Sequence, residues 1–421
     1  MELKSSLELP SGWSVTNIAG EAELLTGFPF ASNQFAKSGV RLARGSNIKR
    51  GEIDWSAEIT KFWPAISDGL KVYELAKGDV VVAMDGALVG ESYGTVTVED
   101  LPALLVQRVT RIRSSPETTK LVGYWIGSGH FARHVNTVKT HTAIPHISLR
   151  DIKEFEFVAP DDLNERKAIV AALADMDAAN AAMTKLLVKK RHLRSATRRQ
   201  LLTGEVRLEG FSNHWVDKRL GEVATVVRGA SPRPIADTRW FDQNSSVGWV
   251  RISDVVKGAM YLDRTTQRLS EDGISRSRRV KRGSVIMSIA ATVGRPSITR
   301  IDACIHDGFV VFEDAKIDTN FLYFLLCFLE PGWSSRGQTG SQTNINTTII
   351  KEEAVSLPAD PEEQAEIALV LMDMDEEVQR LEDRLAKFFA LKQAMMQALL
   401  TGRVRLPVEP GGDAGKELAD A

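Results

Sequence analysis

Cysteine is almost missing from this chain of 421 residues, which has only Cys304 and Cys327. Two cysteines cannot build a disulfide framework or the paired Cys-x-x-Cys motifs of a structural zinc site. Long hydrophobic runs are missing too, since the longest, Phe321 to Leu329, is far shorter than the roughly 20 residues that cross a membrane. Residues 1–13 hold no apolar segment typical of secretion signals. We therefore expect a cytoplasmic protein that is neither secreted nor inserted in a membrane.

An excess of charge of one sign is also missing. The chain has 53 Lys and Arg residues against 55 Asp and Glu, which gives a net charge of −2. The chain as a whole therefore lacks the basic character of many nucleic-acid-binding domains. Hydrophobic residues make up 43% and charged residues 26%, a composition typical of folded globular proteins and not of disordered or fibrous ones. The length leaves room for two or three domains.

What the chain does contain is an internal repeat. Residues 163–208 align without a gap with residues 361–406, at a constant offset of 198 and with 17 identities among the 46 positions. The same offset holds just upstream, where residues 152–160 align with residues 350–358. The sequence therefore consists of two tandem copies of one unit.

Each copy ends in the pattern of a long helix. In the second copy, apolar residues recur in alternating steps of four and three, which is the spacing of a coiled-coil seam. The first copy keeps this spacing but has an asparagine at its centre, a residue that fixes register at some cost in stability. The predicted seam residues are Ile169, Leu173, Met176, Asn180, Met183 and Leu187 in the first helix, and Ile367, Leu371, Met374, Val378, Leu381, Leu385 and Phe388 in the second.

Residues at the ends of both segments favour two helices of about 40 residues, or roughly 60 Å each. Asp162 and Asp360 are placed as N-caps, each with a glutamate three residues later, as in a capping box. Gly204 and Gly402 stand where a C′ glycine ends a helix.

The two helical segments carry opposite charge. Residues 161–209 contain ten basic and seven acidic residues, whereas residues 359–421 contain seven basic and 14 acidic residues. Charges that flank a seam select the partner helix. We therefore predict that the two helices pair with each other as an antiparallel coiled coil, which would hold the two globular parts at opposite ends.

The remaining residues predict two tandem globular domains of α/β (α+β) class. Short apolar runs such as 79–82 and 284–287 are typical of strands, and helices are expected near residues 120–125 and 320–329. The predicted organisation is a first globular domain at 1–160, a first spacer helix at 161–209, a second globular domain at 210–358, a second spacer helix at 359–406 and a disordered tail at 407–421.

These features resemble the specificity subunits of type I DNA restriction-modification systems. The resemblance spans nearly the whole chain, with its motifs in matching order and spacing. It rests on the helix ends LLTGEVRL (201–208) and LLTGRVRL (399–406), the Asp-Met-Asp motifs at 175–177 and 373–375, and the domain openings LPSGW (9–13) and HWVDKRLGEV (214–223).

The resemblance implies that each globular domain is a target-recognition domain, which reads one half of a split, asymmetric sequence in double-stranded DNA. It further implies that the helices act as a spacer and dock two modification (methyltransferase) subunits, joined in some systems by restriction subunits. A specificity subunit performs no catalysis and binds no cofactor itself. S-adenosylmethionine is expected on the methyltransferase subunits, and ATP with Mg²⁺ on a restriction subunit.

Residues suited to DNA contact fall into five groups. Forked donors and acceptors on Arg, Asn and Gln read base edges, whereas Lys and Arg anchor phosphates. A solvated surface is the alternative explanation for each group. The candidates are Arg133, His134, Asn136, Lys139 and His141, and Arg336, Gln338, Thr339, Ser341, Gln342 and Asn344, in two stretches predicted as flexible loops; Arg41, Arg44, Lys49 and Arg50, and Arg276, Arg278, Arg279, Lys281 and Arg282, in two basic clusters; and Arg228 and Arg233 in a proline-containing turn.

Motifs for chemistry are weak. Residues 127–132 match a G-x-G-x-x-A dinucleotide fingerprint, but no predicted strand precedes them. Asp151 is better explained as a helix cap than as half of a nuclease motif. The histidines lack acids or cysteines at ligand spacing, so we predict no metal site. Two alternatives stay open: a DNA methyltransferase or nuclease that acts alone, and a coiled-coil adaptor that does not bind DNA.

Overall fold

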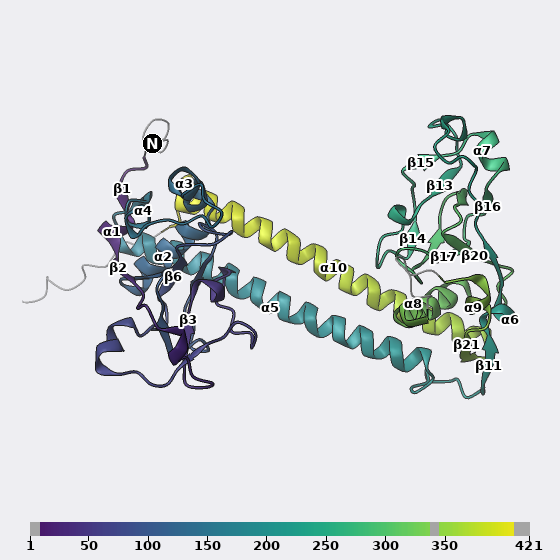
Figure 1. The fold of residues 1–421 in the computed structure, drawn as a ribbon, viewed down its shortest axis with the longest axis horizontal. Helices are drawn as coiled ribbons and strands as arrows, with labels where there is room; N and C mark the ends of the chain where they lie inside the picture. Colours follow the sequence, from purple (N-terminus) through teal and green to yellow (C-terminus); the bar gives the residue numbers. More distant parts are fainter. Residues whose placement is uncertain (1–8, 337–344, 408–421) are drawn as a thin grey trace, which may run out of the picture. The chain divides into compact units, whose positions relative to one another are not determined.

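The computed structural model describes residues 9–336 and 345–407. The chain forms two compact units, of which unit 1 comprises residues 1–184 and 384–421 and unit 2 residues 185–383. Each unit combines one globular domain with parts of both long helices (Figure 1). The predicted disordered tail lies outside the described residues beyond position 407.

The two long helices form where the repeat predicts them. Helix α5 spans Leu163–Leu202 and helix α10 spans Pro361–Leu400, so both have 40 residues and keep the offset of 198. Asp162 and Asp360 cap them by accepting a hydrogen bond from the backbone two residues later, at 3.0 and 2.9 Å. Gly204 and Gly402 follow the helices with φ of +71° and +69°, the left-handed conformation that favours a C′ glycine.

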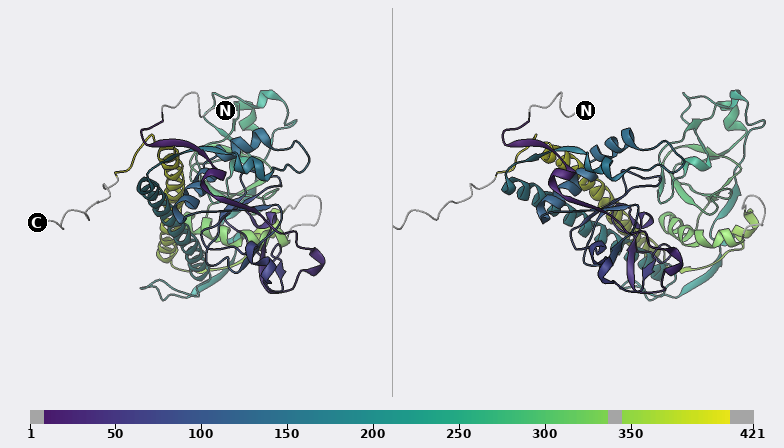
Figure 2. Two further views of the ribbon diagram at one scale, coloured as in Figure 1. Left: turned by 90° about the vertical axis from the view of Figure 1, so that its left-hand side faces the viewer. Right: turned by 60° about the vertical axis from the view of Figure 1, so that its left-hand side comes forward.

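Within each unit, the segments of α5 and α10 run antiparallel and side by side (Figure 2). Residue numbers rise along one helix as they fall along the other, and basic side chains of one helix pair with acidic side chains of the other. These pairs include Arg198–Asp375 at 3.0 Å and Arg191–Glu382 at 2.6 Å in unit 2, and Lys392–Asp177 in unit 1. The predicted antiparallel pairing and its charge complementarity are confirmed.

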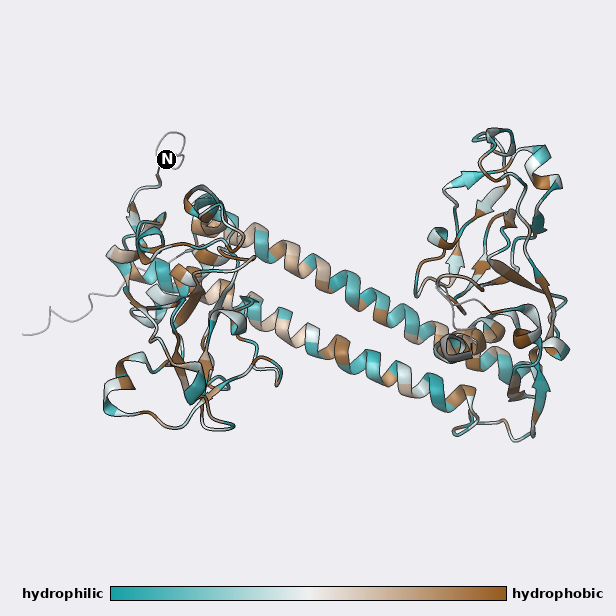
Figure 3. Cartoon of the chain, viewed as in Figure 1, coloured by the Kyte–Doolittle hydropathy of each residue, from teal (hydrophilic) through white to brown (hydrophobic). Residues whose placement is uncertain are grey.

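The predicted seam is buried or half-buried along its whole length. Its most enclosed apolar residues, with at most 5% of the side chain exposed, are Ile169, Leu173, Leu187, Ile367, Leu371 and Val378. Hydrophobic and hydrophilic residues alternate along both helices (Figure 3). Asn180 is 5% exposed, and neither polar atom of its amide has a partner among the described residues. A buried amide without partners lowers stability by about 1–3 kcal/mol. Asn180 therefore reduces the stability of the helix pair, as its place in the seam predicts.

The globular domain of unit 1 is built on two sheets. The larger has the strand order β2-β9-β6-β7-β4, and the smaller has the order β5-β3-β8. Helix α2 covers one face of the larger sheet, where Val80 and Val82 join the same core as Leu121 and Trp125. The bounds are β2 Glu23–Thr26, β3 Val40–Ala43, β4 Arg50–Gly51, β5 Phe62–Trp63, β6 Val80–Ala83, β7 Tyr93–Thr95, β8 Ala103–Leu105, β9 Val109–Arg113, α1 Ile18–Glu21, α2 Pro116–Gly127, α3 His130–Val138 and α4 Leu149–Lys153.

Unit 2 repeats this plan. Its larger sheet has the order β12-β20-β17-β18-β14 and its smaller sheet β15-β13-β19-β16. The bounds are β12 Thr225–Arg228, β13 Gly248–Val250, β14 Tyr261–Leu262, β15 Gln267–Arg268, β16 Arg278–Val280, β17 Val285–Ser288, β18 Pro296–Thr299, β19 Ala303–Ile305, β20 Phe309–Glu313, α6 Leu220–Val223, α7 Glu271–Ser275, α8 Thr319–Arg336 and α9 Thr347–Lys351.

The strand directions show that the duplication extends through the globular domains. In both larger sheets the last pair, β4–β7 or β14–β18, is parallel and the other pairs are antiparallel. In both smaller sheets the corresponding strands, β3–β8 and β13–β19, are also parallel. Each domain is closed by an antiparallel strand pair, β1 (Trp13–Asn17) with β10 (Glu156–Pro160) and β11 (Trp215–Arg219) with β21 (Ala354–Pro358). The predicted tandem α/β (α+β) domains are therefore confirmed.

Candidate nucleic-acid interface

The repeated LLTG-x-VRL motif closes each unit with an ion pair to a buried glutamate. Arg405 Nη2 lies 2.6 Å from Glu165 Oε2, and Arg207 Nε lies 2.5 Å from Glu363 Oε1. The two glutamate side chains are only 1% and 0% exposed. The glutamates that the sequence predicts as capping-box partners therefore bind an arginine that follows the other helix, because a buried carboxylate requires a cationic partner.

The tryptophan of each domain opening packs at the same place. Trp13 Nε1 donates a hydrogen bond to Glu165 at 3.3 Å, and the Arg207 guanidinium lies 5.9 Å from the centre of the Trp215 ring. A Cβ at Gly204 would lie 3.3 Å from Trp215, and one at Gly402 would lie 3.3 Å from Trp13. The motifs shared by the two copies thus assemble the helix ends and the domain openings.

In unit 2, the structure gathers the predicted basic cluster on one edge of the smaller sheet. Strand β16 is the edge strand, and all five cations on it or beside it are exposed. Only Arg279 forms an ion pair with a described residue, at 3.5 Å from Asp302. We name this set the β16 cations: Arg276, Arg278, Arg279, Lys281 and Arg282.

The predicted proline-containing turn lies next to the β16 cations. Ser277 Oγ donates to the carbonyl of Ala230 at 2.7 Å, which ties the turn to the edge strand. Arg228 Nε donates to the backbone carbonyl of Asp307 at 2.8 Å, and Arg233 Nη2 lies 2.6 Å from its carboxylate. The structure therefore brings two of the predicted groups into one basic surface.

Asp307 is the acidic centre of this surface. Burial alone would raise the pKa of Asp307, but the hydrogen bond from Ser231 and the positive charges of His306, Arg233 and Arg228 lower it overall. Burial lowers the pKa of neighbouring His306. At neutral pH the site therefore combines a carboxylate with exposed guanidinium groups, which are donors suited to phosphates and to guanine edges.

The predicted basic cluster of unit 1, on and beside β3 and β4, is engaged within the domain. Arg41 donates to the carbonyl of Glu99 at 2.5 Å and stacks on Trp55 at 5.2 Å. The other three members are bound locally as well. Arg44 donates to Ser46 Oγ at 3.0 Å, Lys49 donates to the carbonyl of Ser46 at 2.8 Å, and Arg50 pairs with Glu91.

The first polar stretch is largely helical, so its prediction as a flexible loop is wrong. Helix α3 spans His130–Val138 because Phe131 and Val135, four residues apart, are buried against the core. His134 Nε2 contacts the carbonyl of Asp151 at 2.8 Å and so supports the fold. Arg133, Asn136 and His141 are exposed, and Lys139 is half-buried.

Of the second polar stretch, only Arg336 falls within the described residues. Gln338, Thr339, Ser341, Gln342 and Asn344 lie outside the described residues, and Arg336 is the last residue of α8. DNA contact by these six residues stays a prediction.

The sequence analysis missed the turn that connects the smaller sheet to the larger sheet in each domain, between β8 and β9 and between β19 and β20. In unit 1 it carries Gln107 and Arg108, both exposed, and Arg108 has φ of +74°. In unit 2 the same turn carries Asp307 and Gly308. Alignment of the strands before these turns, Ala103–Leu105 and Ala303–Ile305, would have revealed the pair.

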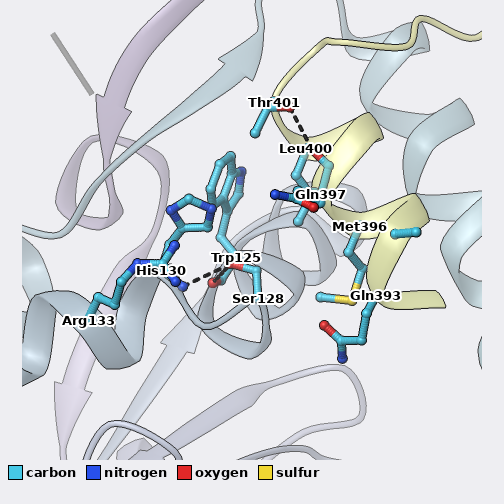
Figure 4. A pocket seen from close by; sticks show the side chains of 10 residues that line it. Trp125, Ser128, His130, Arg133, Gln393, Met396, Gln397, Leu400 and Thr401 are labelled. Carbon is cyan, nitrogen blue, oxygen red and sulfur yellow. Dashed lines mark hydrogen bonds between the residues drawn. The ribbon is translucent and has the colours of Figure 1, made fainter. Parts of the chain in front are cut away.

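A cavity of about 300 Å³ in unit 1 lies between the α2–α3 junction and the end of α10 (Figure 4). The dinucleotide-like residues 127–132 lie at this junction. Gly127 ends a helix there, so the strand that the fingerprint requires before it is replaced by α2. Burial lowers the pKa of His130, with a smaller effect of Arg133. The cavity is lined by Trp125, Ser128, His130, Arg133, Gln393, Ala394, Met396, Gln397, Leu400 and Thr401.

Asp151 acts as a helix cap, since its carboxylate accepts hydrogen bonds from the Ser148 backbone and hydroxyl, both at 2.7 Å. A search of the described residues reveals no cluster of three or more His, Cys, Asp or Glu side chains that could hold a metal. Within the same residues, no helix combines the length and apolar character needed to cross a membrane.

Comparison with known proteins agrees with this architecture. Residues 212–387 match the sequence profile described as "Type I restriction modification DNA specificity domain". The chain is similar to the type I restriction enzyme EcoAI specificity subunit of Escherichia coli, with 29% identity over 150 residues. That match covers 35% of this chain and 25% of the length of the E. coli subunit.

Solved structures share the fold. The specificity subunit of a type I restriction-modification system from M. genitalium matches with a TM-score of 0.60 and 15% identity, over 94% of this chain and 98% of that one. A chain from a study of complex assembly and conformational transition of the type I restriction-modification system matches with a TM-score of 0.57 and 18% identity, over 94% of this chain and 100% of that one. The chain therefore carries a match to the type I restriction-modification DNA specificity domain over residues 212–387, and it shares the fold of the specificity subunit from M. genitalium.

Proposed function

We propose that this protein recognises a split, asymmetric DNA target, with each globular domain reading one half. The observation that carries the proposal is the duplication itself: the larger sheets of the two domains have the same strand order and directions, and corresponding turns bear different side chains. Two domains that share their arrangement of strands but differ at their turns are suited to recognise two different half-sites. The chain contributes specificity and no catalysis.

The basic surface of unit 2 supports phosphate contact. Its β16 cations are exposed, and four of them lack an ion-pair partner among the described residues. Each Lys or Arg that neutralises a phosphate releases condensed counterions, so affinity falls as salt rises. Arg228 and Arg233 lie beside these cations and are the candidates for base contact in the same domain.

The paired helices are the proposed docking surface for two methyltransferase subunits. Large apolar side chains are exposed on both helices at 42–51%, and they offer apolar surface to a partner. They are Leu163, Leu186, Val188 and Leu193 on α5 and Leu369, Phe389 and Leu391 on α10. Restriction subunits would join the assembly through these partners. S-adenosylmethionine would then be bound by the methyltransferase subunits, and ATP with Mg²⁺ by a restriction subunit.

A methylation map of host DNA, with and without this gene, tests the proposal. We expect deletion to remove methylation at one asymmetric motif made of two half-sites and a fixed spacer. The same map identifies the target bases and the spacer length. Unchanged methylation in a host that expresses the partner subunits would overturn the proposal.

An adaptor without DNA binding is the second candidate, favoured only by the exposed apolar residues of the helices. The purified assembly separates the two functions when it is titrated onto duplex DNA at several salt concentrations. Salt-dependent binding to the mapped motif supports DNA recognition, whereas co-purification of partners without any DNA binding supports the adaptor.

A further inference from the structure

The second aspartate of the first Asp-Met-Asp motif joins three helices of unit 1. Asp177 on α5 accepts a hydrogen bond from the hydroxyl of Tyr124 on α2, at 3.0 Å. Its other carboxylate oxygen is ion-paired with Lys392 on α10. The Lys392 ammonium also lies 5.8 Å from the centre of the Tyr124 ring. One carboxylate therefore connects the recognition domain to both long helices.

Unit 2 builds a related arrangement, in which Asp375 and Arg194 correspond to Asp177 and Lys392 at the offset of 198. Asp375 binds Arg194 at 3.2 Å and Arg198 at 3.0 Å. Arg198 also stacks on Phe324 of α8, at 5.3 Å. Burial, followed by Cys327 and Asp375, raises the pKa of Tyr323 on the same helix. The second aspartate of each motif is thus the meeting point of three elements, and we name these two points the aspartate junctions.

The helix that reaches each junction also packs directly on the larger sheet. In unit 1, a Cβ at Gly123 of α2 would lie 3.0 Å from Val80 of β6. In unit 2, α8 packs against β17 and β18. Any rotation of the sheet relative to the long helices must therefore move Tyr124 or Phe324 away from the junction.

The junctions add little to the stability of the fold. Asp177 is 43% exposed and Asp375 31% exposed, and exposed ion pairs contribute little because water and salt screen them. What they supply is direction. Asp177 is held by donors from two other helices, and Asp375 is held by two arginines of α5, one of which stacks on α8. Such contacts restrain the angles between the helices. Substitution should therefore loosen the angle without unfolding the domain.

We propose that Asp177 and Asp375 are positioning residues that enforce the spacer length of the DNA target. This inference rests on the proposed recognition of a split target. One base pair added to the spacer moves the second half-site by about 3.4 Å and by about a tenth of a helical turn. A recognition domain held at a fixed angle cannot follow that movement, whereas a loosened domain can.

The test uses the full specificity subunit with its methyltransferase partners and three duplexes that carry the mapped half-sites. One duplex has the natural spacer, and the others have a spacer longer or shorter by one base pair. We expect Asp177→Asn to reduce the preference for the natural spacer by about three- to five-fold. Asp375→Asn should reduce it further, because two arginines lose their acceptor. Discrimination against single-base changes within either half-site should stay unchanged.

The matched controls are Asp175→Asn and Asp373→Asn, which change the exposed first aspartate of the same motifs. They should leave the preference for the natural spacer intact. Tyr124→Phe is a second, milder variant that removes the hydroxyl and keeps the ion pair, in case Asp177→Asn folds poorly. An unchanged spacer preference in Asp177→Asn, Asp375→Asn and Tyr124→Phe would overturn the inference, as would an equal loss of half-site discrimination. Failure of the unaltered complex to bind the natural duplex would instead contradict the proposed function.

Discussion

The two recognition domains share the strand order of their larger sheets but differ in chemistry at corresponding turns. In unit 1 the β8–β9 turn presents Arg108, whose Nε lies 4.0 Å from Asp85. In unit 2 the β19–β20 turn presents Asp307, which holds Arg228 and Arg233. A cation with an acidic neighbour in one domain thus corresponds to an acid with cationic neighbours in the other. Both copies thus keep the same arrangement of strands in the larger sheet, while the surface that we propose to face DNA differs between them.

The segments that follow the first sheet strand differ in the same way. In unit 1 this segment packs as an aromatic cluster, with ring centres of Phe28 and Phe30 5.0 Å apart and of Phe30 and Trp63 4.8 Å apart. In unit 2 the corresponding segment carries Arg233 and is fastened by Ser231 Oγ, which donates to Asp307 at 2.9 Å. The segment after the first strand of the larger sheet can therefore hold either an apolar cluster or a charged network, while the arrangement of strands stays the same.

The ion pairs to the buried glutamates Glu165 and Glu363 should give the largest effect. Replacement of Arg207 by alanine leaves the Glu363 carboxylate buried without its cation, which costs about 3 kcal/mol. We expect Arg405→Ala to cost less, because Arg405 is 46% exposed, against 26% for Arg207, and because Trp13 still donates to Glu165. Hydrogen exchange should show faster opening of β11–β21 in the first variant and of β1–β10 in the second.

Arg403→Ala is the control for this comparison. Arg403 is two residues from Arg405 and exposed, with only a 3.5 Å contact to the carbonyl of Gln397. It should leave hydrogen exchange unchanged. Equal opening of both strand pairs in either arginine variant would contradict the assignment of one ion pair to each unit.

Removal of cations should affect the two domains unequally. Substitution of Arg278, Lys281 and Arg282 by alanine should weaken the dependence of DNA affinity on salt. The negative slope of log K against log salt should become less steep by up to about 0.9 for each phosphate that is no longer neutralised. The same treatment of Arg41 and Lys49 should change the slope less, because these side chains are bound to Glu99 and Ser46 within the domain. Binding of the assembly to its target duplex at several salt concentrations measures both slopes. If both sets of substitutions changed the salt dependence equally, the β16 cations would contribute no more to phosphate contact than the cluster of unit 1.

Substitution at the divergent turns should alter one half-site at a time. Asp307→Asn removes the charge that holds Arg233, so recognition of the half-site read by unit 2 should weaken by up to about tenfold. Asp85→Asn should act on the other half-site, through Arg108. Methylation of duplexes with single-base changes in each half measures the effect. A loss spread over both halves would contradict the model of two independent readers.

The smallest effect concerns pH. Because the folded-state pKa of Asp307 is lowered, its contribution to the turn is present above its unfolded pKa and is lost as pH falls through the folded value. We expect residues 228–234 to loosen below about pH 4, as measured by hydrogen exchange. Asp307→Asn should remove this dependence, and the corresponding turn of unit 1, which carries Gln107, should not show it.

Much of the architecture could be predicted from the sequence. The gapless repeat predicts two helices of equal length, and the structure has them at the same offset, because period and capping are local properties of a helix. Asn180 was recognised as a polar seam residue from spacing alone. By contrast, α3 was predicted as a loop, since its polar surface residues obscured the buried pair Phe131 and Val135.

The sequence by itself determined the duplication, the antiparallel helix pair and the two positions where each helix begins and ends. Only the tertiary structure decided what the repeated motifs do. The glutamates predicted to cap their own helices bind Arg207 and Arg405, and the second aspartates join three helices at once. The physical reason is that partners more than 150 residues apart are selected by burial and charge in the folded chain. No local pattern encodes such a choice.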